Sequence, residues 1–172
     1  MKKQILFSLL VLIVSCKNQQ VGSDIWKNSS VALSTSDNTP ENFAQYNLQE
    51  ESFYSTLRES GTTEKRSVRI SIPDPDGKFH EFIVWKSIVA NRALVEKYPN
   101  LQTFQGIDVN TDAVRIRIEN SDDGIQAIVF GGENTWYITP VAEVSDNYLV
   151  YYKKDIPAGA KSFWSDKVIQ EK

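Results

Sequence analysis

The stretch SVRISIPDPDGKFHEFIVW, residues 67–85, decides the fold of this chain. Apolar residues alternate with polar ones on both sides of its central DPDG sequence: Val68, Ile70 and Ile72 before it, and Phe79, Phe82 and Val84 after it. Such alternation is typical of strands with one buried face. Pro75 presets φ for a turn, and Gly77 readily takes a positive φ. The stretch therefore predicts a β-hairpin whose apolar face the rest of the chain covers.

Length and composition indicate one folded domain. The 172 residues are 41% hydrophobic and 11% aromatic, which is enough to bury a single core. The formal net charge is −3, and loss of Lys2 and Lys3 with an N-terminal segment would leave 17 basic and 22 acidic residues, a charge of −5. This balance argues against nucleic acid or an anionic membrane surface as the partner.

The N-terminus has the features of a targeting segment. Lys2 and Lys3 precede an apolar run at residues 5–14, which is too short to span a bilayer as a helix. The run ends in LIVSC, which resembles the lipobox of bacterial lipoproteins, so we expect a signal peptide at residues 1–15 and lipidation of Cys16. Lys17 resembles the sorting pattern of outer-membrane lipoproteins. The expected location is therefore the bacterial cell envelope, at the outer membrane.

Three further regions follow the signal peptide. Residues 16–42 are polar and predict a lipidated, flexible tether, with room for one short strand at residues 26–33. Residues 43–155 are expected to form the β-rich domain, and residues 156–172 a C-terminal extension. Cys16 is the only cysteine, which excludes a disulfide within the chain.

Within the domain, helical spacing predicts one helix at residues 49–59 and another at 89–98. Alternating segments predict strands, and these are residues 43–48, 101–109, 112–119, 125–130, 135–139 and 147–153. Short turns between successive strands favour an antiparallel meander. The expected fold is α+β, mainly an antiparallel sheet or sandwich with one or two short helices. The expected core contains Val68, Ile70, Ile72, Phe82, Val84, Leu94, Val114, Ile116, Ile118, Ile128, Phe130, Tyr137 and Val150.

Candidate residues for chemistry are few. His80 is the only histidine, and we interpret it as a solvated strand residue. Asp74 and Asp76 could belong to a calcium loop, but the ligand pattern stops there, which favours a turn. No metal, cofactor or catalytic residue is expected. Aromatic residues on neighbouring strands either pack a core or form a platform for glycan or peptide, and the platform would use Trp136, Tyr148 and Tyr152.

Five stretches carry a resemblance to a known family: SVRISIPDPDGKFHEFIVWKSIV, LVEKYPNLQTFQGIDV, AVRIRIENSDDGIQAIVF, TWYITPV and NYLVYYKKD. In this order they resemble the N-terminal pro-region of secreted reprolysin-type zinc metalloproteases of the Bacteroidetes. The likeness covers about residues 46–155. The HEXXH zinc helix of those enzymes does not occur in this sequence. The resemblance therefore implies a propeptide-like domain that binds a protease, without the protease activity.

These observations lead to one main functional hypothesis and its alternatives. The chain is expected to be a non-catalytic, lipid-anchored envelope protein that binds a metalloprotease catalytic domain or another protein. One alternative is a surface lipoprotein that binds glycan or peptide through exposed aromatic residues. The other is a truncated metalloprotease precursor with no retained activity.

Overall fold

The computed structural model describes residues 23–33, 38–88, 96, 98–141 and 144–160. Several sequence-based predictions fall outside these residues. They are the signal peptide, lipidated Cys16, nearly all of the helix at 89–98 with Leu94, and most of the C-terminal extension.

The hairpin predicted from residues 67–85 is confirmed. Strand β3 (Val68–Pro73) pairs antiparallel with β4 (Phe79–Ser87), with Ile70 opposite Phe82. In the turn, the Asp74 amide donates to the Lys78 carbonyl at 2.8 Å, and Gly77 has φ +86°. The Asp74 carboxylate also accepts from the amides of Asp76 and Lys78, so this side chain fixes the conformation of the turn.

The strands form one antiparallel sheet in the order β1-β2-β9-β8-β7-β6-β5-β4-β3. The remaining strands are β1 (Trp26–Asn28), β2 (Ala44–Leu48), β5 (Gln102–Asp108), β6 (Arg115–Ser121), β7 (Gly124–Phe130), β8 (Trp136–Pro140) and β9 (Asn147–Tyr152). Strands β3 to β9 are a meander, because each pairs with its neighbour in the chain, and β2 joins the far side of β9. The expected α+β fold with a mainly antiparallel sheet is confirmed.

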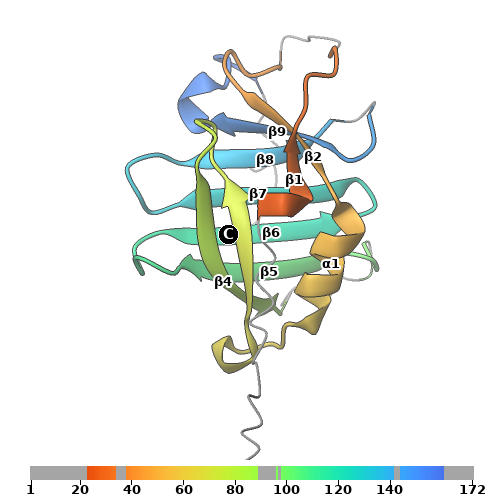
Figure 1. Ribbon diagram of the computed structural model, residues 1–172, viewed down its shortest axis with the longest axis vertical. Coiled ribbons are helices and arrows are strands. Elements are labelled where there is room, and N and C mark those ends of the chain that lie inside the picture. The colour runs from red at the N-terminus through yellow and green to blue at the C-terminus, as the bar shows by residue number, and fades with distance from the viewer. Residues whose placement is uncertain (1–22, 34–37, 89–95, 97, 142–143, 161–172) are drawn as a thin grey trace, which may run out of the picture.

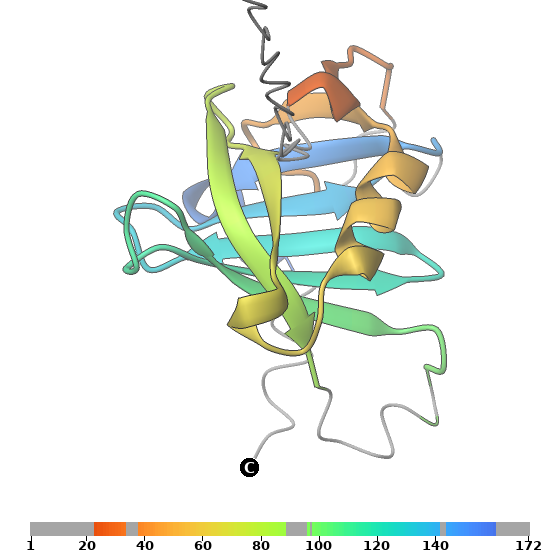
Figure 2. The same cartoon turned by 60° about the horizontal axis from the view of Figure 1, so that its bottom comes forward.

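The sheet curls into a half-barrel, so that its first and last strands approach each other. The β3–β4 hairpin and helix α1 (Glu50–Glu59) lie across the same face of strands β5 to β9 (Figures 1 and 2). Helix α1 buries Phe53 and Leu57 against this face. The 3-10 turns are η1 (Ser23–Ile25), η2 (Glu64–Arg66) and η3 (Lys153–Asp155). Among the helices that the structure describes, none combines the length and the apolar character needed to cross a bilayer.

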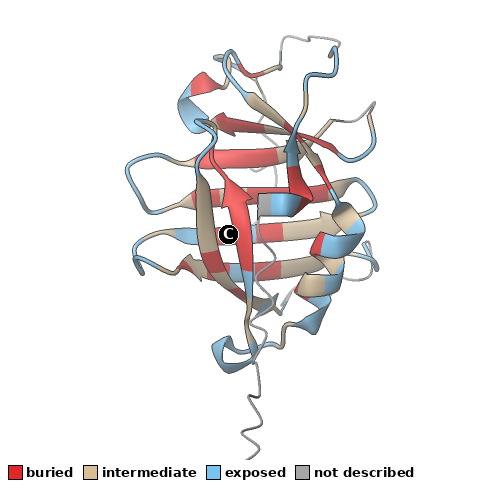
Figure 3. Cartoon of the chain, viewed as in Figure 1, coloured by how far each residue is buried: buried red, intermediate tan, exposed pale blue. Residues whose placement is uncertain are grey.

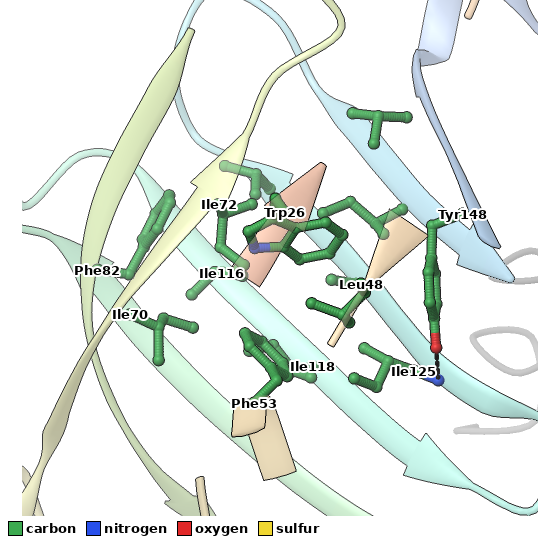
Figure 4. Packing of buried hydrophobic residues seen from close by; sticks show 14 of the residues in the cluster. Trp26, Leu48, Phe53, Ile70, Ile72, Phe82, Ile116, Ile118, Ile125 and Tyr148 are labelled. Atoms are coloured by element: carbon green, nitrogen blue, oxygen red, sulfur yellow. Dashed lines mark hydrogen bonds between the residues drawn. The ribbon is translucent and has the colours of Figure 1, made fainter. Parts of the chain in front are cut away.

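The core fills the concave side of this half-barrel (Figures 3 and 4). Its largest fully buried side chains are Leu48, Phe53, Leu57, Ile70, Ile72, Phe82, Val84, Ile116, Ile118, Ile125, Ile138 and Tyr148. Trp26, at 4% exposure, belongs to the same cluster. The folded unit therefore begins closer to the N-terminus than residue 43, where we expected the domain to start.

In strand β7, the residues that face the core are not the ones that we predicted. Ile125, Ala127 and Val129 belong to the core cluster, whereas Ile128 and Phe130 lie on the opposite face and are only half-buried. The prediction of Ile128 and Phe130 as core residues is wrong. Tyr137, also predicted in the core, is buried on this outer face, opposite Ile128 in the register and beside Tyr151 at 5.6 Å between ring centroids.

Candidate binding site

An open cavity of about 800 Å³ lies at one end of the sheet, beside the start of helix α1. Three separate parts of the chain form it: the first turns of α1, the turn between β6 and β7, and the connection between β8 and β9. Its described lining residues are Glu50, Tyr54, Ser121, Asp122, Asp123, Gly124, Gln126, Thr139, Pro140, Val141, Val144, Ser145, Asp146 and Asn147.

The lining is acidic. It carries four carboxylates, and none of the described residues that line it is a lysine or an arginine. The backbone conformations of two turns position three of these carboxylates. Gly124 takes φ +99° and closes the β6–β7 turn, which carries Asp122 and Asp123 at its tip. Asp146 has φ +60°, a left-handed conformation that aspartate and asparagine tolerate better than most residues.

Glu50 is held in place from beneath by Tyr148. The Tyr148 hydroxyl donates to Glu50 Oε1 and accepts from the Ile125 amide at 3.3 Å, the contact drawn in Figure 4. Tyr148 itself is 0% exposed. Burial and the hydrogen bond to Glu50 raise the pKa of Tyr148 above its ordinary range. A buried, neutral tyrosine therefore positions the carboxylate at the start of α1.

The pKa of Tyr54, which lines the same cavity, is raised by its surroundings. Burial and then the charges of Glu50, Asp146 and Glu51 raise the pKa of Tyr54 to about 12. A phenolate is disfavoured both by loss of water and by nearby carboxylates. The site therefore disfavours added negative charge.

Gln126 supplies an acceptor that the protein itself does not use. The residue is 5% exposed and lines the cavity, yet its Oε1 has no hydrogen-bond partner among the described residues. A buried acceptor without a partner costs about 1–3 kcal/mol. With an accessible area below 1 Å², this oxygen is closed to solvent and to any group that enters the cavity.

The three aromatic residues predicted to form a platform do not share one open surface. Tyr148 lies under the acidic cavity, whereas Trp136 and Tyr152 are register partners at the opposite end of strands β8 and β9. Trp136 is 6% exposed and packs on the His80 ring at 5.1 Å. The half-buried Tyr152 donates its hydroxyl to Asp76 Oδ2 at 2.7 Å. Neither Trp136 nor Tyr148 presents a ring face to a ligand from solution.

A second polar cluster lies at that opposite end. His80 Nε2 is 2.9 Å from Asp74 Oδ2, and His80 Nδ1 is 3.8 Å from Asp108 Oδ2. Asp74 and Asp108 are buried and His80 is mostly buried, so His80 is not the solvated strand residue that we expected. In the described part of the chain no three histidine, cysteine or acidic side chains are placed to hold a metal ion. The cluster joins the hairpin turn to the end of β5.

Comparisons of the chain with protein-family models, with curated proteins and with solved structures gave no match. The resemblance to a metalloprotease pro-region therefore rests on the quoted sequence motifs alone.

Proposed function

We propose that this chain is a lipid-anchored protein of the bacterial cell envelope that acts by binding another protein and carries out no reaction itself. The observation that carries the proposal is the open acidic cavity beside the start of α1. A concave site with few, converging polar groups is the usual form of a binding site. The cavity is built from loops on a rigid sheet, which is where binding residues commonly lie.

The sheet edges are less suitable contact surfaces than the cavity. An open edge could add a strand from a partner. Strand β1 has only three residues, however, and in β3 Pro73 has no N–H while the Ser71 carbonyl already accepts from Trp26. We therefore place the partner at the cavity end of the sheet.

The proposed partner is a metalloprotease catalytic domain, as the pro-region resemblance implies. The folded domain should then associate with such a catalytic domain and slow its cleavage of a peptide. No association at ~100 μM, a binding free energy of about −5.5 kcal/mol, would exclude this partner.

The proposed anchor is the lipid on Cys16. Each buried methylene of an acyl chain adds ~0.8 kcal/mol, so multiple chains hold a protein stably on a membrane. Wild-type protein should enter the detergent phase of a phase-partition experiment, and Cys16→Ser should remain in the aqueous phase. A serine variant that still partitions with detergent would contradict lipidation at this residue.

Photo-crosslinking in the native envelope tests the binding surface. A photoreactive amino acid at Ser145, an exposed residue that lines the cavity, should capture a protein of defined mass. The matched control is the same amino acid at Glu133, which is exposed in the β7–β8 connection at the opposite end. Equal capture at both positions, or none at Ser145, would contradict the proposed surface.

A further inference from the structure

We propose that residues 161–172 of this chain lie across the outer face of strands β7 to β9 and cover Tyr137 and Tyr151. The outer face is the side of the sheet that points away from helix α1. On these three strands it is formed by Gln126, Ile128, Phe130, Tyr137, Leu149 and Tyr151. The inference concerns a surface that the proposed function does not use, and it stands independently of that function.

Two tyrosines on the outer face are buried although they do not belong to the core. Tyr137 is 5% exposed and Tyr151 is 8% exposed, and neither is part of the hydrophobic cluster on the concave side. Their ring centroids are 5.6 Å apart, and such a pair covers at most one face of each ring. Burial also raises the pKa of both phenols, so the hydroxyl groups have lost water as well. Both side chains are therefore shielded from solvent on the outer side of the sheet.

The described elements leave the outer face without a second layer. Helix α1 and the β3–β4 hairpin both lie on the concave side (Figures 1 and 2). Ile128 and Leu149, the neighbours of the tyrosines on the outer face, are themselves only half-buried. An antiparallel sheet with one uncovered face normally keeps that face in water. Because the tyrosines are buried in the single chain, their cover comes from a part of this chain outside the described residues and not from a partner.

The position of Tyr151 in the chain indicates which part this is. Tyr151 lies near the end of β9, η3 follows that strand directly, and the described chain ends at residue 160. Residues 161–172 thus continue from the strand that carries one of the two tyrosines. Residues 89–95, in contrast, follow β4, which three strands separate from β8. Residues 1–22 precede η1, which packs against β1 and β3.

Residues 161–172 are long enough for this path. A fully extended segment of this length spans about 40 Å. Neighbouring strands lie about 4.8 Å apart, so the distance from β9 across β8 to β7 is about 10 Å. A helix of the same length, at about 1.5 Å per residue, would still reach about 18 Å. The segment can therefore cover both tyrosines in either conformation.

The composition of the segment suits an apolar, aromatic surface. Its large apolar residues are Phe163, Trp164, Val168 and Ile169. Aromatic and aliphatic side chains pack favourably on tyrosine rings, and here they would meet the rings of Tyr137 and Tyr151. Left in water, they would add an exposed apolar patch of the kind that folded proteins keep small outside interaction sites. Packing on the outer face therefore buries apolar surface on both partners.

Photo-crosslinking within the purified full chain in detergent micelles tests this placement. The photoreactive amino acid p-benzoylphenylalanine replaces Ile128, the half-buried register partner of Tyr137. After trypsin digestion, the crosslink should join residue 128 to peptide 162–167 or 168–172 of the same chain. The matched control has the same amino acid at Tyr54, which packs against the core on the concave side, and should give no such crosslink. A crosslink from residue 128 to a second copy, or none to these two peptides, overturns the inference.

Hydroxyl-radical footprinting measures the cover that the segment provides. The double variant Phe163→Ser/Trp164→Ser keeps the full length of the chain and removes the two aromatic side chains of the segment. The rates of modification at Tyr137 and Tyr151 should rise several-fold in this variant, because the rate follows the exposed area of each ring. Equal rates in the wild type and in the variant would show that the aromatic pair does not cover the tyrosines and would overturn the inference.

Two controls separate local uncovering from general unfolding. Ser162→Ala/Ser165→Ala alters the same segment but keeps its apolar side chains, so it should leave the rates at Tyr137 and Tyr151 unchanged. Tyr148, which is 0% exposed in the core, should stay protected in every variant. An increase at Tyr148 as large as that at Tyr137 would show that the variant unfolds, and the crosslink from residue 128 then decides the inference. An increase at Tyr137 with the serine-to-alanine variant as large as with the aromatic variant would overturn it.

Discussion

The indole Nε1 of Trp26 donates a hydrogen bond to the backbone carbonyl of Ser71 at 2.9 Å, between residues 45 positions apart in the sequence. Trp26 begins β1 and Ser71 lies in β3, the two outermost strands of the sheet order. One side chain thus connects the two edges of the half-barrel and covers a carbonyl that an edge strand would otherwise expose. The contact also removes part of the β3 edge from pairing with another chain.

This contact predicts different effects for two similar substitutions. Trp26→Phe removes the donor and leaves a buried carbonyl unpaired, so it should lower the free energy of unfolding by about 1–3 kcal/mol. Trp136→Phe is the matched control, because Trp136 Nε1 is buried without a partner in the described chain. In urea denaturation, Trp136→Phe should lower the free energy of unfolding by distinctly less than Trp26→Phe does. Equal losses would show that ring volume, and not the hydrogen bond, explains the effect.

The sequence predicted the elements whose chemistry is local. The β3–β4 hairpin was predictable because Asp74, Pro75 and Gly77 define its turn within a few residues. The contact of Trp26 was not, because its partner is remote and the surrounding sequence is polar. Strand β7 has isoleucine on both faces, at Ile125 and Ile128, so alternation alone could not decide which face meets the core.

The cavity could not be predicted from the sequence, for a related reason. Its carboxylates come from a helix start, a hairpin turn and a strand connection that meet only when the sheet has formed. Asp122 and Asp123 lie between β6 and β7 in a short turn, and a turn gives no information about its neighbours in space. The raised pKa of Tyr54 and the unpaired Oε1 of Gln126 likewise depend on burial, which composition does not show.

The second cluster should contribute to stability through its histidine. His80→Leu removes the imidazole from the buried carboxylates of Asp74 and Asp108, which keep only their backbone-amide donors, and should lower the free energy of unfolding by about 2 kcal/mol. The double variant His80→Leu/Asp108→Asn should recover part of this loss, because asparagine carries no charge. Strictly additive losses in a double-mutant cycle would contradict the coupling of the two residues.

Gly106 is predicted to be intolerant of a side chain. It lies in β5 where β4 approaches closely, and an added Cβ would lie 2.6 Å from the Ile83 carbonyl oxygen and 2.7 Å from Val84 Cγ2. Gly106→Ala should therefore destabilise the protein by about 1–3 kcal/mol in urea denaturation. Gly132→Ala is a suitable control, since its Cβ would meet only a side-chain methyl of Val114 at 3.1 Å. A larger loss at Gly132 than at Gly106 would contradict this account.

Alkaline pH should destabilise the fold through Tyr54. The pKa of this tyrosine is about 12 in the folded protein and ordinarily about 10 in an unfolded chain. Above about pH 10 the unfolded state has lost a proton that the folded state keeps, so the free energy of unfolding falls as pH rises toward about 12. The contribution of Tyr54 to this slope should stay below the full 1.4 kcal/mol per pH unit, because Tyr54 is partly exposed and water screens its neighbours. Other tyrosines with a raised pKa, such as Tyr148, add to the total slope in the same direction.

Urea denaturation at a series of pH values measures this slope. Tyr54→Phe removes the titrating group, so its stability should fall less steeply than that of the wild type above about pH 10, while the two slopes agree below about pH 9. Asp146→Asn should act in the same direction more weakly, because it removes only one of the charges that raise the Tyr54 pKa. A Tyr54→Phe slope equal to that of the wild type would place the alkaline transition elsewhere. It would also contradict the raised pKa of Tyr54 and the effect of the nearby carboxylates on it.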